Sequence, residues 1–254
     1  DNLNRAYKRV KSNHGAAGID GMTVEEALPW LKEHRGELLQ SIREGSYMPN
    51  PVRRKEIPKP DGGVRKLGIP TVVDRVIQQA IAQKLQNIWE PLFSDSSYGY
   101  RPKRSAGQAI QKVKEYAEEG YRYAVSVDLS KYFDTLNHEL LMNLLHKQIQ
   151  DMRVLSLIKK YLKSGVMENG VVCKTEEGSP QGGPLSPLLA NIYLNEFDWE
   201  MNNRGVKLVR YADDIVVFAK SKRAAERQLE SCRKYLEGRL RLKMNTEKSK
   251  VSSV

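Results

Sequence analysis

The sequence of 254 residues carries 42 lysine and arginine residues against 31 aspartate and glutamate residues, which gives a formal net charge of +11. A hydrophobic content of 40% suits a globular chain, whereas 29% charged residues and the lack of an apolar run of about 18 residues argue against a membrane protein. A positive excess of this size is typical of proteins that bind a polyanion, because each phosphate contact releases counterions.

The positive charge is clustered, which favours a nucleic-acid partner over a merely soluble basic protein. One cluster comprises Arg53, Arg54, Lys55, Lys59, Arg65 and Lys66, and a second comprises Arg239, Arg241, Lys243, Lys248 and Lys250. Two cysteines, Cys173 and Cys232, lack metal-ligand spacing and indicate free thiols in a cytoplasmic chain, either in a bacterial cell or in an organelle matrix.

The first half of the chain is predicted to be helical around one β-hairpin. Thr23 can cap a helix over residues 24–31, because Glu26 completes a capping box. Asp61-Gly62-Gly63 predicts the turn of a hairpin over residues 52–70. Further helices are predicted over residues 37–43, 73–89 and 106–119.

From Tyr121 the pattern changes to strand-like alternation, and a strand is predicted to end at Asp128. A second hairpin is predicted over residues 207–219, with Tyr211-Ala212-Asp213-Asp214 between its strands. The remaining predicted elements are helices over 137–148, 154–163, 188–202 and 223–237, an extended segment over 166–174 and a short strand over 241–244. This order predicts an α+β fold with an antiparallel sheet backed by helices.

Three carboxylates border the predicted strands. Asp128 ends one strand, and Asp213 and Asp214 lie between two others. A carboxylate beside an apolar core is costly unless it is paired with a cation. A salt bridge is the simpler explanation for any one of them, but three in a basic chain favour a site that holds two Mg²⁺ ions for phosphoryl transfer.

Four segments resemble the palm motifs of reverse transcriptases, and they occur in the family's order. Tyr211-Ala212-Asp213-Asp214 resembles the YxDD box, and the segment 126–134 resembles the first palm motif. The Pro180-Gln181-Gly182 loop lies between them, and residues 240–250 resemble the fourth motif. The resemblance implies RNA-directed DNA polymerase activity, with dNTP as substrate and an RNA template and a DNA primer as partners.

Other segments resemble group II intron-encoded reverse transcriptases, namely residues 15–21, 57–70, 74–78 and 97–102. The likeness covers residues 13–251 and implies a right-hand polymerase. Fingers are expected over 1–121 and 141–178, and the palm over 122–140 and 179–254. A thumb follows in that family, and the sequence ends where we expect it to begin.

The resemblance also implies roles for single residues at the metal site. Asp128 and Asp213 would bind both Mg²⁺ ions, with Mn²⁺ as a substitute, while Asp214 assists and the Leu129 carbonyl adds a ligand. Lys248 would protonate the leaving pyrophosphate, with Lys250 as the alternative. Asp134 and Asn137 are better explained as turn and N-cap residues.

Further roles concern the nucleotide. Phe133, five residues after Asp128, would act as a steric gate against the 2′-hydroxyl group, with a core aromatic as the alternative. Lys59 and Arg65 would grip the triphosphate, with a solvated basic hairpin as the alternative. Gln181 would contact the sugar or base, and Gly182 would let the backbone approach the nucleotide.

The family resemblance implies a second role as a maturase that binds the intron RNA and assists splicing. The basic N-terminal segment with Arg5, Lys8, Arg9 and Lys11, together with the rest of the first 50 residues, is expected to carry it. Tyr98, Tyr100 and Arg101 would contact template nucleotides, with packing as the alternative for the two tyrosines. Retron, diversity-generating and CRISPR-linked reverse transcriptases and a mainly RNA-binding splicing fragment remain as alternatives. Phe133 and the Tyr211-Ala212-Asp213-Asp214 box argue against an RNA-dependent RNA polymerase. A homo-oligomer stays open.

Overall fold

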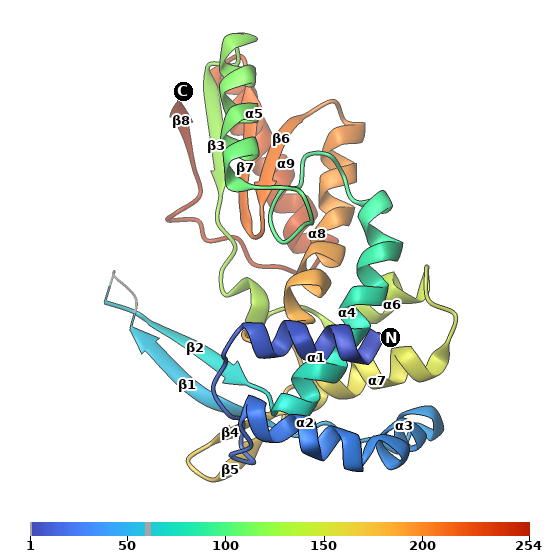
Figure 1. Ribbon diagram of the computed structural model, residues 1–254. Coiled ribbons are helices and arrows are strands. Elements are labelled where there is room, and N and C mark those ends of the chain that lie inside the picture. Colours follow the sequence, from blue (N-terminus) through green and yellow to red (C-terminus); the bar gives the residue numbers. More distant parts are fainter. Residues whose placement is uncertain (1, 59–61) are drawn as a thin grey trace. The chain divides into compact units, whose positions relative to one another are not determined.

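The computed structural model describes residues 2–58 and 62–254. The chain forms two compact units, of which the first comprises Asp1–Ile88 and His138–Leu188 and the second Trp89–Asn137 and Leu189–Val254 (Figure 1). Within the described ranges no helix combines the length and the apolar character needed to cross a bilayer. The two units are described in turn.

The first unit is mainly helical, as predicted. Its helices are α1 (Asn2–Ser12), α2 (Val24–Glu33), α3 (Arg35–Glu44), most of α4 (Val72–Trp89), α6 (His138–His146) and α7 (Met152–Lys163). The Thr23 side chain accepts a hydrogen bond from the Glu26 backbone, so the predicted capping box is confirmed. Ala6, Tyr7 and Val10 of α1 pack with Val72 and Val76 of α4, and thereby anchor the N-terminal helix.

A small sheet in the order β2-β1-β4-β5 completes the first unit. Its strands are β1 (Val52–Pro58), β2 (Val64–Ile69), β4 (Val166–Glu168) and β5 (Val171–Cys173). The predicted hairpin is confirmed by the antiparallel pairing of β1 and β2. The extended segment over 166–174 folds into a second hairpin, whose strand β4 pairs in parallel with β1.

Asp74 ties the helices of the first unit to the base of the β1–β2 hairpin. The side chain is 1% exposed and accepts hydrogen bonds from the Tyr47 hydroxyl at 2.7 Å, the Tyr161 hydroxyl at 3.1 Å and the Thr71 hydroxyl at 2.8 Å. The Asn50 backbone N–H donates a further bond. Burial, and then the charge of Asp74, raise the pKa of Tyr47, so this buried carboxylate is satisfied by neutral donors.

The second unit contains an antiparallel sheet in the order β6-β7-β3-β8. Its strands are β3 (Tyr123–Val127), β6 (Lys207–Tyr211), β7 (Asp214–Ala219) and β8 (Lys250–Ser253). Helix α5 (Ala106–Glu118) covers one face, and α9 (Lys222–Gly238) covers the other (Figure 1). Helix α8 (Ser186–Asn203) lies mainly in this unit, together with two short 3-10 helices, η1 (Glu90–Leu92) and η2 (Tyr132–Asp134).

The strand predicted over residues 241–244 is wrong. Arg241 has a φ of 54°, in the left-handed region, so the chain turns before an extended strand can form. Leu240, Leu242 and Met244 are all buried, which explains the alternating pattern, but only Met244 forms a bridge, to Leu129. The strand that pairs with β3 is instead β8, six residues further along the chain.

The two compact units have boundaries of their own, and the assignment of fingers and palm stays a prediction. Residues 89–121 belong to the second unit, because Ser97 forms a bridge with Arg210 and α5 packs on β6. Residues 179–188 belong to the first unit, because the Gln181 carbonyl accepts a hydrogen bond from the Gly68 N–H at 2.7 Å. Long-range pairing of this kind is not visible in local sequence patterns.

Candidate active site

The three predicted metal-binding aspartates all lie in the second unit, at one end of its sheet. Asp128 directly follows β3, Asp213 lies in the turn between β6 and β7, and Asp214 begins β7. Strands β3 and β7 are neighbours, and Val127 pairs with Ile215. Asp128 and Asp214 are the next residues beyond this pair, and their charges interact, so the fold brings together carboxylates that are more than 80 residues apart in the sequence.

The charges of these carboxylates interact. The pKa of Asp214 is raised, first by partial loss of hydration and then by the negative charges of Asp213 and Asp128, although the Asp214 side chain is exposed. A bound cation would relieve this repulsion, and carboxylate oxygens are the ligands that hard divalent cations prefer. The donor set therefore fits a divalent metal ion.

The carboxylates do not form a closed cage. Among residues 2–58 and 62–254, no group of three histidine, cysteine, aspartate or glutamate side chains is arranged to hold a metal ion. The fold thus places the three aspartates near one another, and their binding of a metal ion stays a prediction.

The turn that carries Asp213 is conformationally strained. Ala212 has a φ of 59°, a left-handed conformation that costs a residue with a side chain about 1–2 kcal/mol. Gly99 packs against this turn so closely that a Cβ atom there would lie 2.3 Å from the Ala212 nitrogen. Only glycine at position 99 is compatible with this approach, and the contact restricts the position of the turn.

A buried ion pair between Arg210 and Asp198 supports the same turn. The guanidinium of Arg210 contacts both oxygens of Asp198, and its Nη2 atom lies 2.6 Å from Oδ2. Its Nη1 atom donates hydrogen bonds to the Ala212 carbonyl at 2.8 Å and to Asn191 Oδ1 at 2.9 Å. Burial alone would lower the pKa of Arg210. The charge of Asp198 and the hydrogen bonds to it act in the opposite direction, and the pKa of the arginine is raised.

The sequence analysis did not single out Arg210, Asp198 or Asn191. Arg210 and Asp198 are both 0% exposed, and the Asn191 amide donates to the Gly99 carbonyl at 2.8 Å. A signal was available, because Arg210 interrupts the apolar residues Leu208 and Val209 of a predicted strand. An arginine there needs a buried acidic partner, and α8 supplies it.

Lys248 lies in a turn that is attached to the backbone of Asp128. The Asn245 N–H donates to the Asp128 carbonyl at 2.8 Å, and the Asp128 N–H donates to Ser249 Oγ at 3.0 Å. The Asn245 side chain accepts a hydrogen bond from the Lys248 N–H. Asn245 and Ser249, which the sequence analysis missed, thus position both Asp128 and the exposed Lys248, whereas Lys250 begins β8 opposite Ser126.

The two neighbouring aromatic residues of η2, Tyr132 and Phe133, differ in burial. Tyr132 is 3% exposed, and its hydroxyl donates to the Ala190 carbonyl, so Tyr132 is the core aromatic. Phe133 is only partly buried and contacts the Tyr132 ring edge-on at 5.5 Å between centroids. Phe133 is therefore not fully buried, and its role as a steric gate stays a prediction. Leu129, whose carbonyl was a predicted ligand, has a buried side chain.

The predicted nucleotide contacts Arg65, Gln181 and Gly182 belong to the first unit. Arg65 is exposed on β2. Gly182 has a φ of 123°, and a Cβ atom there would lie 2.5 Å from the Gly68 carbonyl, so packing against β2 already requires glycine. Its approach to a nucleotide stays a prediction. Lys59 lies outside the described residues.

Arg101 makes its contacts within the protein, a role that the sequence analysis did not predict for this residue. Its guanidinium pairs with Glu90 at 2.8 Å and donates to the carbonyls of Ser94 and Ser97. Tyr98 is buried, whereas Tyr100 is 49% exposed. Of these three residues, Tyr100 alone offers a largely accessible ring.

Comparison with known proteins places these features in a family. Residues 57–253 match the family model described as reverse transcriptase (RNA-dependent DNA polymerase). The chain belongs to the reverse transcriptase family. Its solved structural neighbours include telomerase from Candida albicans, with a TM-score of 0.65 and 14% identity over 90% of this chain and 45% of that chain, which supports the fold alone.

Two relatives add detail to this membership. Protein YkfC of Escherichia coli is 37% identical over 99% of this chain and 77% of its own length. The group II intron-encoded protein LtrA of Lactococcus lactis is 43% identical over 76% of this chain and 32% of its own length, so this reverse transcriptase chain matches about a third of LtrA. The predicted resemblance to group II intron-encoded reverse transcriptases is confirmed.

Proposed function

We propose that the chain is an RNA-directed DNA polymerase of a group II intron. It would extend a DNA primer on an RNA template by attack of the primer 3′-hydroxyl on the α-phosphate of a dNTP, with release of pyrophosphate. The observation that carries this proposal is the convergence of Asp128, Asp213 and Asp214 at one sheet edge in a member of the reverse transcriptase family.

Family membership alone does not identify the metal ligands, so they are proposed separately. We assign Asp128 and Asp213 as ligands of two Mg²⁺ ions, with Asp214 and the Leu129 carbonyl as further ligands and Mn²⁺ as a substitute. When bound, such a pair activates the attacking hydroxyl and stabilises the charge of the in-line transition state. The hydrogen bond from Arg210 to the Ala212 carbonyl and the close packing of Gly99 hold the turn in place, so the position of Asp213 does not depend on a bound ion.

The nucleotide contacts complete the proposal. Lys59 and Arg65 would hold the triphosphate. Gln181 and Gly182, in the loop that begins at Pro180, would contact the rest of the nucleotide. Lys248 would donate a proton to the pyrophosphate, and its turn is already hydrogen-bonded to Asp128.

The relatives also support a role in binding intron RNA. Arg5, Lys8, Arg9 and Lys11 are exposed on α1, while the opposite face of this helix is buried in the first unit. The charges are therefore displayed on an anchored helix. Because α1 contributes to the core, its deletion would disturb folding, and charge substitution is the appropriate test of RNA binding.

The metal requirement tests the polymerase assignment directly. We expect the chain to extend a DNA primer on an RNA template with Mg²⁺ and dNTPs, and to lose extension when EDTA removes the metal. Extension should return with Mg²⁺ or Mn²⁺, and the rate at low metal should rise more steeply than linearly if two ions act. Extension that persists in excess EDTA would exclude metal-assisted transfer.

Phe133→Ala is expected to relax discrimination against ribonucleotides, because the ring no longer fills the space of the 2′-hydroxyl group. Single-nucleotide incorporation should show a rise in kcat/KM for rNTPs of roughly tenfold or more, the size expected when a steric contact in a pocket is lost. The efficiency for dNTPs should change less. Phe133→Tyr, which keeps the ring, is the control, and an unchanged ribose preference in the alanine variant would make Phe133 a packing residue.

A further inference from the structure

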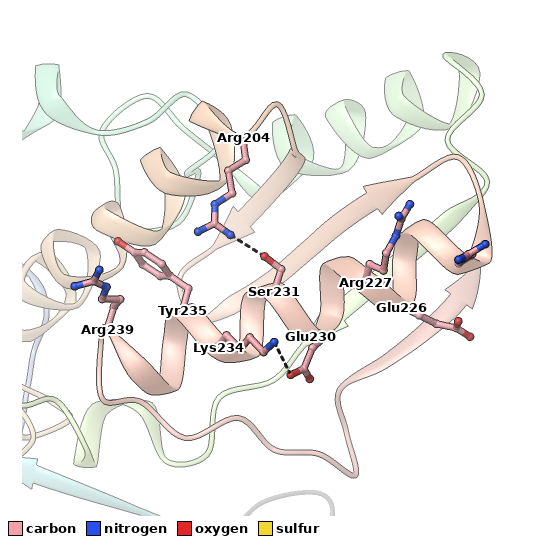
Figure 2. Close-up of a pocket in the computed structure, with 9 residues that line it drawn as sticks. Arg204, Glu226, Arg227, Glu230, Ser231, Lys234, Tyr235 and Arg239 are labelled. Atoms are coloured by element: carbon pink, nitrogen blue, oxygen red, sulfur yellow. Dashed lines mark hydrogen bonds and ion pairs between the residues drawn. The ribbon is translucent and has the colours of Figure 1, made fainter.

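A basic groove lies on the second unit, along the outer side of α9. It has a volume of about 710 Å³ and is lined by Arg204, Arg223, Glu226, Arg227, Glu230, Ser231, Lys234, Tyr235 and Arg239. Figure 2 shows that most of these side chains project from α9, while Arg204 reaches over Ser231 from the end of α8. Five of the lining residues are basic and two are acidic.

The basic side chains form a stripe along one face of the helix. Arg223, Arg227 and Lys234 lie four and seven residues apart, which places them on the same side of α9 over roughly 16 Å at about 1.5 Å per residue. Ala225, Cys232 and Leu236 of the same helix are buried and face the protein. The charged stripe is therefore held in place by a packed inner face.

The positive charge of the groove is only partly neutralised. Arg204 pairs with Glu200, and Glu230 pairs with Arg233 and more distantly with Lys234. In residues 2–58 and 62–254, no ion pair involves Arg223, Arg227 or Arg239. Exposed arginines without a carboxylate partner are ready to bind an external anion.

The groove is distinct from the carboxylate site. Helix α9 packs with its inner face on β3, β7 and β8, and the groove residues lie on its outer face and at the end of α8. None of the aspartates assigned to metal binding lines it. The groove thus has no part in the transfer reaction described above.

We propose that this groove binds the phosphate backbone of structured RNA. The proposal rests on the RNA-binding role proposed above and assigns that role a surface outside α1. Arg223 and Arg227 would each contact a phosphate, with Arg239 and Lys234 extending the track toward the end of the helix. Ser231 Oγ, which accepts a hydrogen bond from Arg204, keeps its own proton to donate to a phosphate or to a ribose 2′-hydroxyl group.

The test is a salt titration of RNA affinity with a fluorescein-labelled stem-loop RNA. Arg223→Gln/Arg227→Gln is compared with Lys114→Gln/Lys159→Gln, which removes the same charge from exposed positions outside the groove. The groove variant should bind on the order of tenfold or more weakly near 0.1 M salt, and the log–log salt slope should shrink by about 0.7–0.9 per arginine. The control should change far less on both measures.

Three further outcomes are decisive. Arg223→Lys/Arg227→Lys keeps both charges and should retain most of the affinity and salt slope, which separates electrostatics from misfolding; melting temperatures check the fold of each variant. Equal RNA affinity of the groove variant and its control would contradict RNA binding by the groove. A large loss of affinity confined to Lys8→Gln/Arg9→Gln would then place RNA binding on α1. If the unaltered chain does not bind the RNA but still extends primers, the proposals that the groove and the chain bind RNA are both contradicted. The polymerase proposal then stands.

Discussion

Asp213→Asn is expected to lower primer extension by on the order of a thousandfold or more, because a neutral carboxamide replaces an anionic ligand at the point where transition-state charge is stabilised. Asparagine has nearly the same size and shape as aspartate, so the strained Ala212 turn and its contact with Arg210 should survive. Single-turnover extension under saturating Mg²⁺ measures the effect.

Asp134→Asn provides the matched control, since Asp134 is an exposed aspartate in η2 that we assign to the turn and not to the metal site. Its extension rate should stay close to that of the unaltered chain. RNA affinity should remain nearly intact in both variants. Full extension by the Asp213 variant would remove this aspartate from the metal site and with it the two-metal assignment.

Arg210→Met is expected to lower the free energy of unfolding by about 3–5 kcal/mol, because the buried Asp198 charge is left without its partner. In a chain of this size the melting temperature should fall by roughly 6–20 °C. The Ala212 carbonyl also loses its donor, so primer extension should fall further than the loss of folded protein explains.

The double variant Arg210→Met/Asp198→Leu separates these two effects. Replacing a buried ion pair by apolar residues is often neutral for stability, so thermal melting should recover most of the loss. Extension should stay low, because no side chain then fixes the Asp213 turn. If extension recovers together with the melting temperature, Arg210 acts through stability alone and not by positioning the turn.

Local patterns in the sequence predicted most elements of the fold, because helices and hairpins are specified by residues close in the chain. The Thr23 capping box and the hairpin around Asp213 are examples. The strand over 241–244 was mispredicted because Leu242 and Met244 are buried alternately, with the same period as in a strand. The segment nevertheless lacks the hydrogen-bond ladder of a strand and forms a single bridge, from Met244 to Leu129.

The candidate site was predicted where a motif carries it and missed where distant segments meet. Asp128 and Asp213 were found from strand ends and motif order. The supporting contacts of Gly99 and Ser249 were not: both residues lie in segments that resemble the family, but the resemblance does not show which distant residue each one meets. Arg210 alone carried a local sign, as a charge within an apolar strand.

The attachment of Asp128 to Ser249 has a consequence for how the protein folds. The two residues are 121 positions apart, and strand β3 finds both of its sheet neighbours only among later segments of the chain. Pairings of such high contact order form slowly, because a long loop must close before the contact stabilises it. During synthesis, Asp128 therefore leaves the ribosome well before its partners exist. The end of the sheet that carries Asp128, Asp213 and Asp214 is expected to assemble late, after the local helices and hairpins have formed.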